Sequence, residues 1–140
     1  MTEGQNRRSR PAGETGGSTQ RAPQGLVDPA LRFDLAAETE QLRKETSYQA
    51  GHRNGKTLVK EPTFRIVLTV LKGGVRLQEH HAAAPVSVQT VTGHLRLHVP
   101  GGIVDLPAGH LLVLERDVPH DVEALEETAF LLTIAWPEGR

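Results

Sequence analysis

The side chains best suited to chemistry in this chain are its histidines. There are seven of them, whereas cysteine is absent. Without cysteine, the chain has no disulfide, no thiolate zinc site and no thiol catalysis. An imidazole can bind a divalent metal or transfer a proton near neutral pH. The candidate metal ligands and proton carriers are therefore His52, His80, His81, His94, His98, His110 and His120.

Two of these histidines, His80 and His120, lie in one patterned segment, residues 74–120. Short alternating or apolar runs recur in it, separated by turns that contain glycine or proline. Strands at this spacing are typical of an antiparallel sandwich or barrel. In such a fold the two histidines can meet in the interior.

The strand pattern continues on both sides of this segment. Strands are expected at residues 56–60, 63–71, 75–81, 86–92, 94–99, 103–106, 111–114, 120–124 and 129–136. These runs are rich in Val, Ile, Leu and Thr, which favour strands. The run 111–114 is apolar at every position, which predicts a strand buried on both faces.

Alternation predicts which side chains face the core. In 86–92, Val86 and Val88 point inward. In 120–124, Val122 brings His120 to the same inner side, whereas 75–81 groups His81 with its apolar positions. Outward positions, at the solvent or an interface, are expected for His94, Arg96 and His98.

The chain ahead of the strands has a different character. Residues 1–25 hold no aromatic side chain and are dominated by Gly, Ser, Thr, Arg and Pro, which predicts a disordered tail. In 26–55, Asp34 can cap a helix that begins near Leu35 and presents Leu35, Thr39 and Leu42 on one face. A loop at 49–55 completes this part. We expect the helix on the outside of a barrel over 56–136, and a tail at 137–140.

Composition restricts the class of protein. With 140 residues the chain makes one domain. Its formal net charge is -1 and no basic patch stands out, which disfavours nucleic acid as a partner. No apolar run approaches the ~20 residues of a membrane helix, and the polar N-terminus does not read as a secretory signal. We therefore expect a cytoplasmic protein without membrane or nucleic-acid partners.

Two spacings resemble the motifs of the cupin superfamily. Gly74, His80 and Gly93 match the first motif, G-x5-H-x-H-x(3–4)-E-x6-G. Gly109 and His120 match the second, G-x5-P-x-G-x2-H-x3-N. The resemblance extends over roughly residues 56–136. It implies a small all-β protein with the cupin double-stranded β-helix, or jelly-roll barrel, and a homodimer that pairs through sheet edges.

The chain departs from the first motif at positions that usually hold the metal. Ala82 stands at the second His position and Val86 at the Glu position. The resemblance leaves His80 and His120 as metal ligands, with His81 as a replacement only if the chain is irregular there. A catalytic divalent ion generally needs about three protein ligands. The sequence therefore predicts no definite cofactor, and Fe, Mn, Zn or Ni is the candidate metal ion.

Two functions remain open. The first is a degenerate cupin that binds a small molecule in an apolar pocket, without metal-dependent catalysis. The alternative is a metal-dependent cupin enzyme, of the dioxygenase or isomerase type, that uses a reduced histidine site. The residues of the expected pocket are His80, Val86, Val88, His120 and Val122.

A group of polar residues ahead of the first long strand also has two interpretations. These residues either line the mouth of the barrel and attract an anionic ligand, or they form only a surface loop and a strand edge. They are His52, Arg53, Lys56 and Lys60.

Overall fold

The computed structural model describes residues 29–137. The tail predicted at 1–25 lies outside the described residues, and so does the tail predicted at 137–140 except for its first residue. The helices are α1 (Leu35–Lys44) and α2 (Thr46–Gly51). The strands are β1 (Arg53–Glu61), β2 (Phe64–Leu71), β3 (Arg76–His80), β4 (Val86–Thr92), β5 (His94–Val99), β6 (Gly102–Pro107), β7 (Leu111–Leu114), β8 (His120–Ala124) and β9 (Thr128–Ala135).

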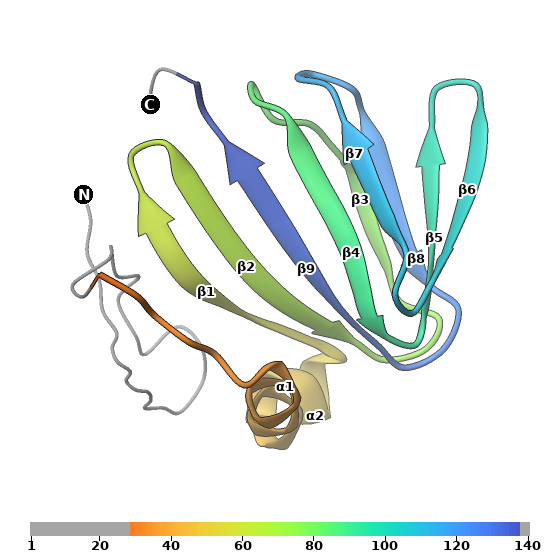
Figure 1. Cartoon of the computed structure of the whole chain (residues 1–140). Helices are drawn as coiled ribbons and strands as arrows, with labels where there is room; N and C mark the ends of the chain where they lie inside the picture. The colour runs from red at the N-terminus through yellow and green to blue at the C-terminus, as the bar shows by residue number, and fades with distance from the viewer. Residues whose placement is uncertain (1–28, 138–140) are drawn as a thin grey trace.

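The strands form two antiparallel sheets that pack face to face (Figure 1). The five-stranded sheet has the order β1-β2-β9-β4-β7, and the four-stranded sheet has the order β3-β8-β5-β6. The predicted all-β jelly roll is confirmed, and among the described residues it takes the form of a sandwich of two separate sheets. No helix in this part of the chain is long and apolar enough to cross a bilayer.

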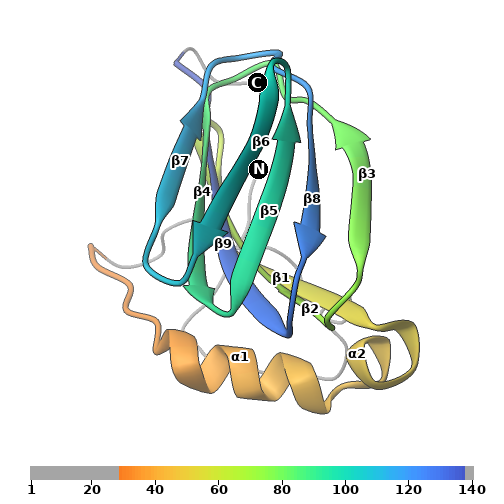
Figure 2. The ribbon, with the colours of Figure 1, turned by 90° about the vertical axis from the view of Figure 1, so that its right-hand side faces the viewer.

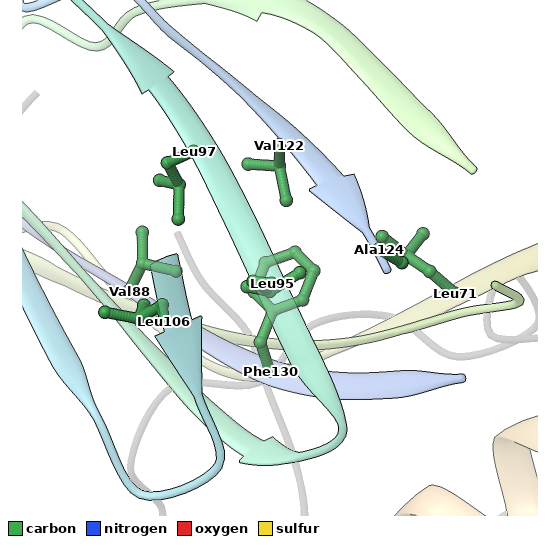
Figure 3. Packing of buried hydrophobic residues seen from close by; sticks show 8 residues of the cluster. All are labelled: Leu71, Val88, Leu95, Leu97, Leu106, Val122, Ala124 and Phe130. Carbon is green, nitrogen blue, oxygen red and sulfur yellow. The ribbon is translucent and has the colours of Figure 1, made fainter. Parts of the chain in front are cut away.

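The core lies between the two sheets (Figure 3). Val88 and Phe130 reach it from the five-stranded sheet, and Leu95, Leu97 and Val122 reach it from the four-stranded sheet. Each of these side chains is buried. The alternation read from 86–92 and 120–124 therefore gave the correct inner face, because a strand turns successive side chains to opposite sides.

The first helix is the one predicted. The Asp34 carboxylate accepts a hydrogen bond from the Ala37 amide at 3.1 Å and caps α1. Thr39 and Leu42 are its buried residues. The helix packs against the outer face of the five-stranded sheet and runs along the lower end of the molecule in Figure 2. There Leu42 packs in an apolar cluster with Leu68 of β2.

The loop predicted at 49–55 is wrong, because residues 46–51 form α2 and β1 already begins at Arg53. Composition alone suggested a loop, but tertiary contacts hold a helix here. Tyr48 is 3% exposed and packs in the outer apolar cluster. The Asn54 amide donates to the Leu42 carbonyl and to the Glu45 carboxylate, both at 2.9 Å. Burial of one aromatic ring therefore stabilises a helix whose own sequence favours it weakly.

The prediction of a strand buried on both faces at 111–114 is also wrong. β7 is the outermost strand of the five-stranded sheet and pairs with β4. Leu111 and Val113 are 57% and 65% exposed, whereas Leu114 is buried. An apolar run cannot reveal its place in a sheet, because periodicity does not distinguish an edge strand from a central one.

Four connections cross from one sheet to the other at the same end of the molecule: β2–β3, β4–β5, β6–β7 and β8–β9 (Figure 1). Gly93 joins β4 to β5 with φ of 89° and lies against Thr128, the first residue of β9. The Thr128 hydroxyl accepts from the His94 amide at 3.0 Å and donates to the Glu126 carbonyl at 2.7 Å. The β4–β5 and β8–β9 connections are therefore held together by hydrogen bonds to one side chain.

We predict that Gly93→Ala is severely destabilising. The added Cβ would overlap the Glu127 carbonyl oxygen and lie 2.7 Å from the Thr128 Cα, at a backbone φ that L residues disfavour. The free energy of unfolding should fall by roughly 3 kcal/mol or more. Denaturant unfolding measures this.

The matched control is Gly101→Ala in the β5–β6 turn. Gly101 has φ of 90°, but a Cβ there has no atom within 4 Å. Gly101→Ala should therefore lose only about 1 kcal/mol of unfolding free energy, from the left-handed backbone conformation alone. Equal losses in the two variants would refute the close-contact explanation.

Tyr48 connects α2 to the β8–β9 connection through a second side-chain hydrogen bond. Its hydroxyl donates to the Glu127 carboxylate at 2.5 Å, and Arg43 Nε lies 3.4 Å from the same oxygen. Burial, followed by the hydrogen bond to Glu127, raises the pKa of Tyr48 to about 12. The folded protein therefore holds this proton more tightly than the unfolded chain does.

We predict a loss of stability above pH ~10, since the tyrosine pKa in the unfolded chain is about 10. The contribution is complete below that pH and disappears as pH rises toward the folded pKa of about 12. Tyr48→Phe should remove this alkaline slope, which denaturant unfolding at successive pH values measures. Tyr48 is the only tyrosine, so ultraviolet titration reports it directly. Ionisation of the native protein near pH ~10 would contradict the prediction.

Candidate functional site

His120 is the histidine that the fold places in the interior. It begins β8, and its side chain is 3% exposed, on the same side as buried Val122 and Ala124. The prediction that His120 faces inward is confirmed. The position lies at the end of β8 opposite the four crossings described above. Two further crossings, β3–β4 and β7–β8, meet there through a hydrogen bond from the Asp117 amide to the Ala82 carbonyl, at 2.8 Å.

The backbone of His80 lies beside that of His120. In the β3–β8 ladder Leu77 pairs with Val122 and His80 pairs with His120, so β3 has one more residue than β8 between the two pairs. This bulge breaks the alternation that grouped His81 with the apolar positions, since an extra residue reverses the faces beyond it. The side chain of His80 lies outside what the structure describes, and its role stays a prediction.

His81 follows β3 and lies at the surface. Its side chain is 64% exposed, and its Nδ1 is 3.9 Å from a carboxylate oxygen of Asp117. His120, in contrast, is buried. His81 could serve as a third metal ligand only if the chain is irregular here, and the chain is irregular. The His81 side chain nevertheless points to the exposed carboxylate of Asp117.

The three valines of the expected pocket are buried. Val88 and Val122 belong to the main core cluster, whereas Val86 packs in a separate cluster with Leu114 and Ile134. Their contacts are those of core side chains. Their role as walls of a ligand pocket stays a prediction.

The imidazole of His120 has a defined orientation. Its Nδ1 lies 3.0 Å from the Val118 carbonyl oxygen. Because a carbonyl only accepts, Nδ1 carries a hydrogen and donates it to Val118. The same carbonyl contact is typical of histidines that bind a metal or accept a proton through Nε2.

The donor set does not fit a catalytic metal. Ala82 and Val86 occupy two motif positions, carry no donor atom, and both pack in an apolar cluster. Among the side chains that the structure describes, which leave out those of Glu79 and His80, no three His, Asp or Glu are grouped as metal ligands would be. Two imidazoles fall short of the roughly three ligands that catalytic sites use.

The outward histidines lie in a charged surface on the four-stranded sheet, as predicted. His98 Nε2 is 3.3 Å from the Glu123 carboxylate, and His94 Nε2 is 3.8 Å from that of Asp105. Arg96 donates to Asp105 at 2.8 Å, and this hydrogen bond lowers the pKa of the carboxyl. Paired opposite charges across neighbouring strands are typical of a solvated sheet face.

A cleft that the sequence did not specify opens at the side of the sandwich. Its volume is about 370 Å³. It is lined by Ser47, Arg53, Asn54, Gly55, Thr69 and Leu77. Of the polar group expected at the mouth, only Arg53 lines this cleft, while Lys56 is turned to the helices and pairs with Glu38 at 2.7 Å. The only sequence feature that could have indicated this cleft was a charged residue, Arg53, at the start of a strand. Charged residues at strand starts are common on protein surfaces, so the feature is not specific.

Comparisons with known proteins support the fold. No protein-family model and no curated protein sequence matches the chain. Among solved structures, a conserved protein of unknown function from Streptococcus pyogenes matches with TM-score 0.65 and 22% identity, over 81% of this chain and 93% of that one.

Two further solved structures match the chain. An RmlC-like cupin from Desulfovibrio desulfuricans matches with TM-score 0.56 and 24% identity, over 79% of this chain and 92% of that one. A variant of salicylate 1,2-dioxygenase from Pseudoaminobacter salicylatoxidans matches with TM-score 0.59 and 16% identity, over 72% of this chain and 32% of that one. Together with the two-sheet topology and the motif glycines, these likenesses show that the chain is a cupin-fold protein.

Proposed function

We propose that this chain binds a small molecule in the interior of its cupin fold and does so without metal-dependent catalysis. The observation that carries the proposal is the replacement of two motif ligands by Ala82 and Val86, which pack in apolar surroundings. Apolar side chains at these positions provide no negative charge to compensate that of a bound metal ion. The same side chains suit the apolar part of an organic ligand.

In this proposal His120 is the polar anchor. A ligand hydroxyl or amide could donate to it while the rest of the molecule contacts Val86, Val88 and Val122. His80, whose backbone pairs with that of His120, would be the second anchor.

The metal-dependent enzyme is the alternative. Two observations favour it: the carbonyl contact that orients His120 and the backbone pairing of His80 with His120. The dioxygenase named above shares the fold at 16% identity, and fold alone supports many chemistries. Measurement of metal binding separates the two functions.

We predict that Fe(II), Mn(II), Zn(II) and Ni(II) bind the wild type no more tightly than they bind His80→Ala/His120→Ala. Calorimetric titration of untagged protein measures this. The expected result is weak binding of equal strength, because two imidazoles without a carboxylate hold an ion poorly. Ala82→His/Val86→Glu restores both motif ligands and serves as the positive control. Stoichiometric binding by the wild type that the double variant loses would overturn the metal-free proposal.

We also propose that the protein is a homodimer that pairs through β7. Leu111 and Val113 are exposed on this edge strand, and an uncovered apolar edge favours pairing with another strand. A cytoplasmic location and the lack of membrane or nucleic-acid partners stay predictions from the sequence.

We predict that Val113→Lys converts the dimer to a monomer, because a charge on the edge opposes strand pairing. Sedimentation equilibrium gives the mass. Leu125→Lys, on a 39% exposed leucine in the β8–β9 connection, is the matched control and should leave the dimer intact. A wild type that sediments as a monomer at every concentration would refute the dimer.

A further inference from the structure

The lateral cleft lies where the open edges of the two sheets face each other. β1 is the outermost strand of the five-stranded sheet, and β3 is the outermost strand of the four-stranded sheet. α2 lies at the same side of the molecule (Figure 2). Arg53 and Gly55 line the cleft from β1, Leu77 lines it from β3, and Ser47 lines it from α2.

Among the described side chains that line the cleft, Arg53 is the only charged one. Within residues 29–137 its guanidinium makes no hydrogen bond or ion pair. The arginines on the four-stranded sheet differ in this respect, since Arg76 and Arg96 each bond an aspartate. Arg53 is therefore available to an anion, and a guanidinium is suited to binding a carboxylate through two parallel hydrogen bonds.

The acids near this end of the molecule already have partners. The Glu45 carboxylate accepts from Asn54, and the Glu127 carboxylate accepts from Tyr48. Among the side chains that the structure describes, which do not include that of Glu79 in β3, no carboxylate lines the cleft itself. A bound anion would therefore meet a positive charge without a competing acid.

Gly55 provides the space beside this charge. It pairs with Thr69 across the β1–β2 ladder, and its φ is not positive. A Cβ built on Gly55 would lie 3.4 Å from the Leu68 carbonyl oxygen and 3.6 Å from the Thr69 hydroxyl oxygen. The missing side chain thus leaves that hydroxyl open to the cleft, and a larger residue would fit the backbone while filling the space.

We propose that this cleft binds a small organic carboxylate. The carboxylate accepts hydrogen bonds from Arg53 and from the hydroxyls of Ser47 and Thr69, and the apolar body of the acid contacts Leu77. The volume of about 370 Å³ is near the lower end of ligand pockets, which suits a compact acid. This site goes beyond the function proposed above, because it uses none of the interior residues around His120.

The test is a titration with benzoate, monitored by backbone amide NMR of the full chain. We expect saturable shifts at Gly55, Thr69 and Leu77, and much smaller shifts with neutral benzamide. Arg53→Gln should weaken benzoate binding about tenfold or more, as expected for loss of a charged hydrogen bond. Gly55→Val should abolish binding by filling the cleft.

Two variants keep the outcome clear. Arg116→Gln removes a 63% exposed arginine from the β7–β8 turn and so matches the charge change of Arg53→Gln at a distant site. It should leave the affinity unchanged, whereas His120→Asn tests whether benzoate binds in the interior instead. If Gly55→Val does not fold, Thr69→Val replaces it and should weaken binding by removing the hydroxyl.

Three results would overturn the proposal. The first is an unchanged affinity in Arg53→Gln, and the second is an equal response to benzamide. The third is a loss of benzoate binding in His120→Asn together with unchanged binding in Arg53→Gln. That result would place the acid in the interior. That third result would support the function proposed above while removing the lateral site.

Discussion

The close contact of Gly93 with Thr128 is the constraint on which the two-sheet arrangement depends. The chain changes sheets at both residues, and the two backbones approach until no Cβ fits between them. Such an approach requires glycine at the crossing and a small hydroxyl side chain opposite it. The buried Thr128 hydroxyl then satisfies backbone groups of both connections. A buried backbone group without such a partner would cost free energy.

The neighbouring crossings extend this closed end. The Gly74 amide donates to the Ala124 carbonyl at 2.8 Å, and the Ala108 amide donates to the Gly93 carbonyl at 3.1 Å. On the outside, the hydrogen bond from Tyr48 to Glu127 ties the helices to the same connection. With this end held, the strands run toward the other end with the register that brings the backbones of His80 and His120 together.

The interior and the lateral cleft differ in chemistry for a structural reason. Side chains from both sheets meet in the interior, which is therefore largely apolar, with His120 and Thr90 as buried polar residues. The cleft lies where the outermost strands β1 and β3 have no further strand beside them. Polar side chains are tolerated there because water reaches them. The fold thus separates a buried imidazole from an exposed guanidinium, which suits two different kinds of ligand group.

Alternation and turn residues in the sequence determined the strands, the inner faces of β4 and β8, and the capped start of α1, because these depend on neighbours within a few residues. The replacement of motif ligands at Ala82 and Val86 was equally readable. Tertiary structure alone decided the rest. It placed β7 at an edge, formed α2 around Tyr48, and inserted the bulge that pairs His80 with His120. It also brought Arg53 and Leu77 to one cleft. Each of these depends on contacts between segments distant in the chain, which no local pattern encodes.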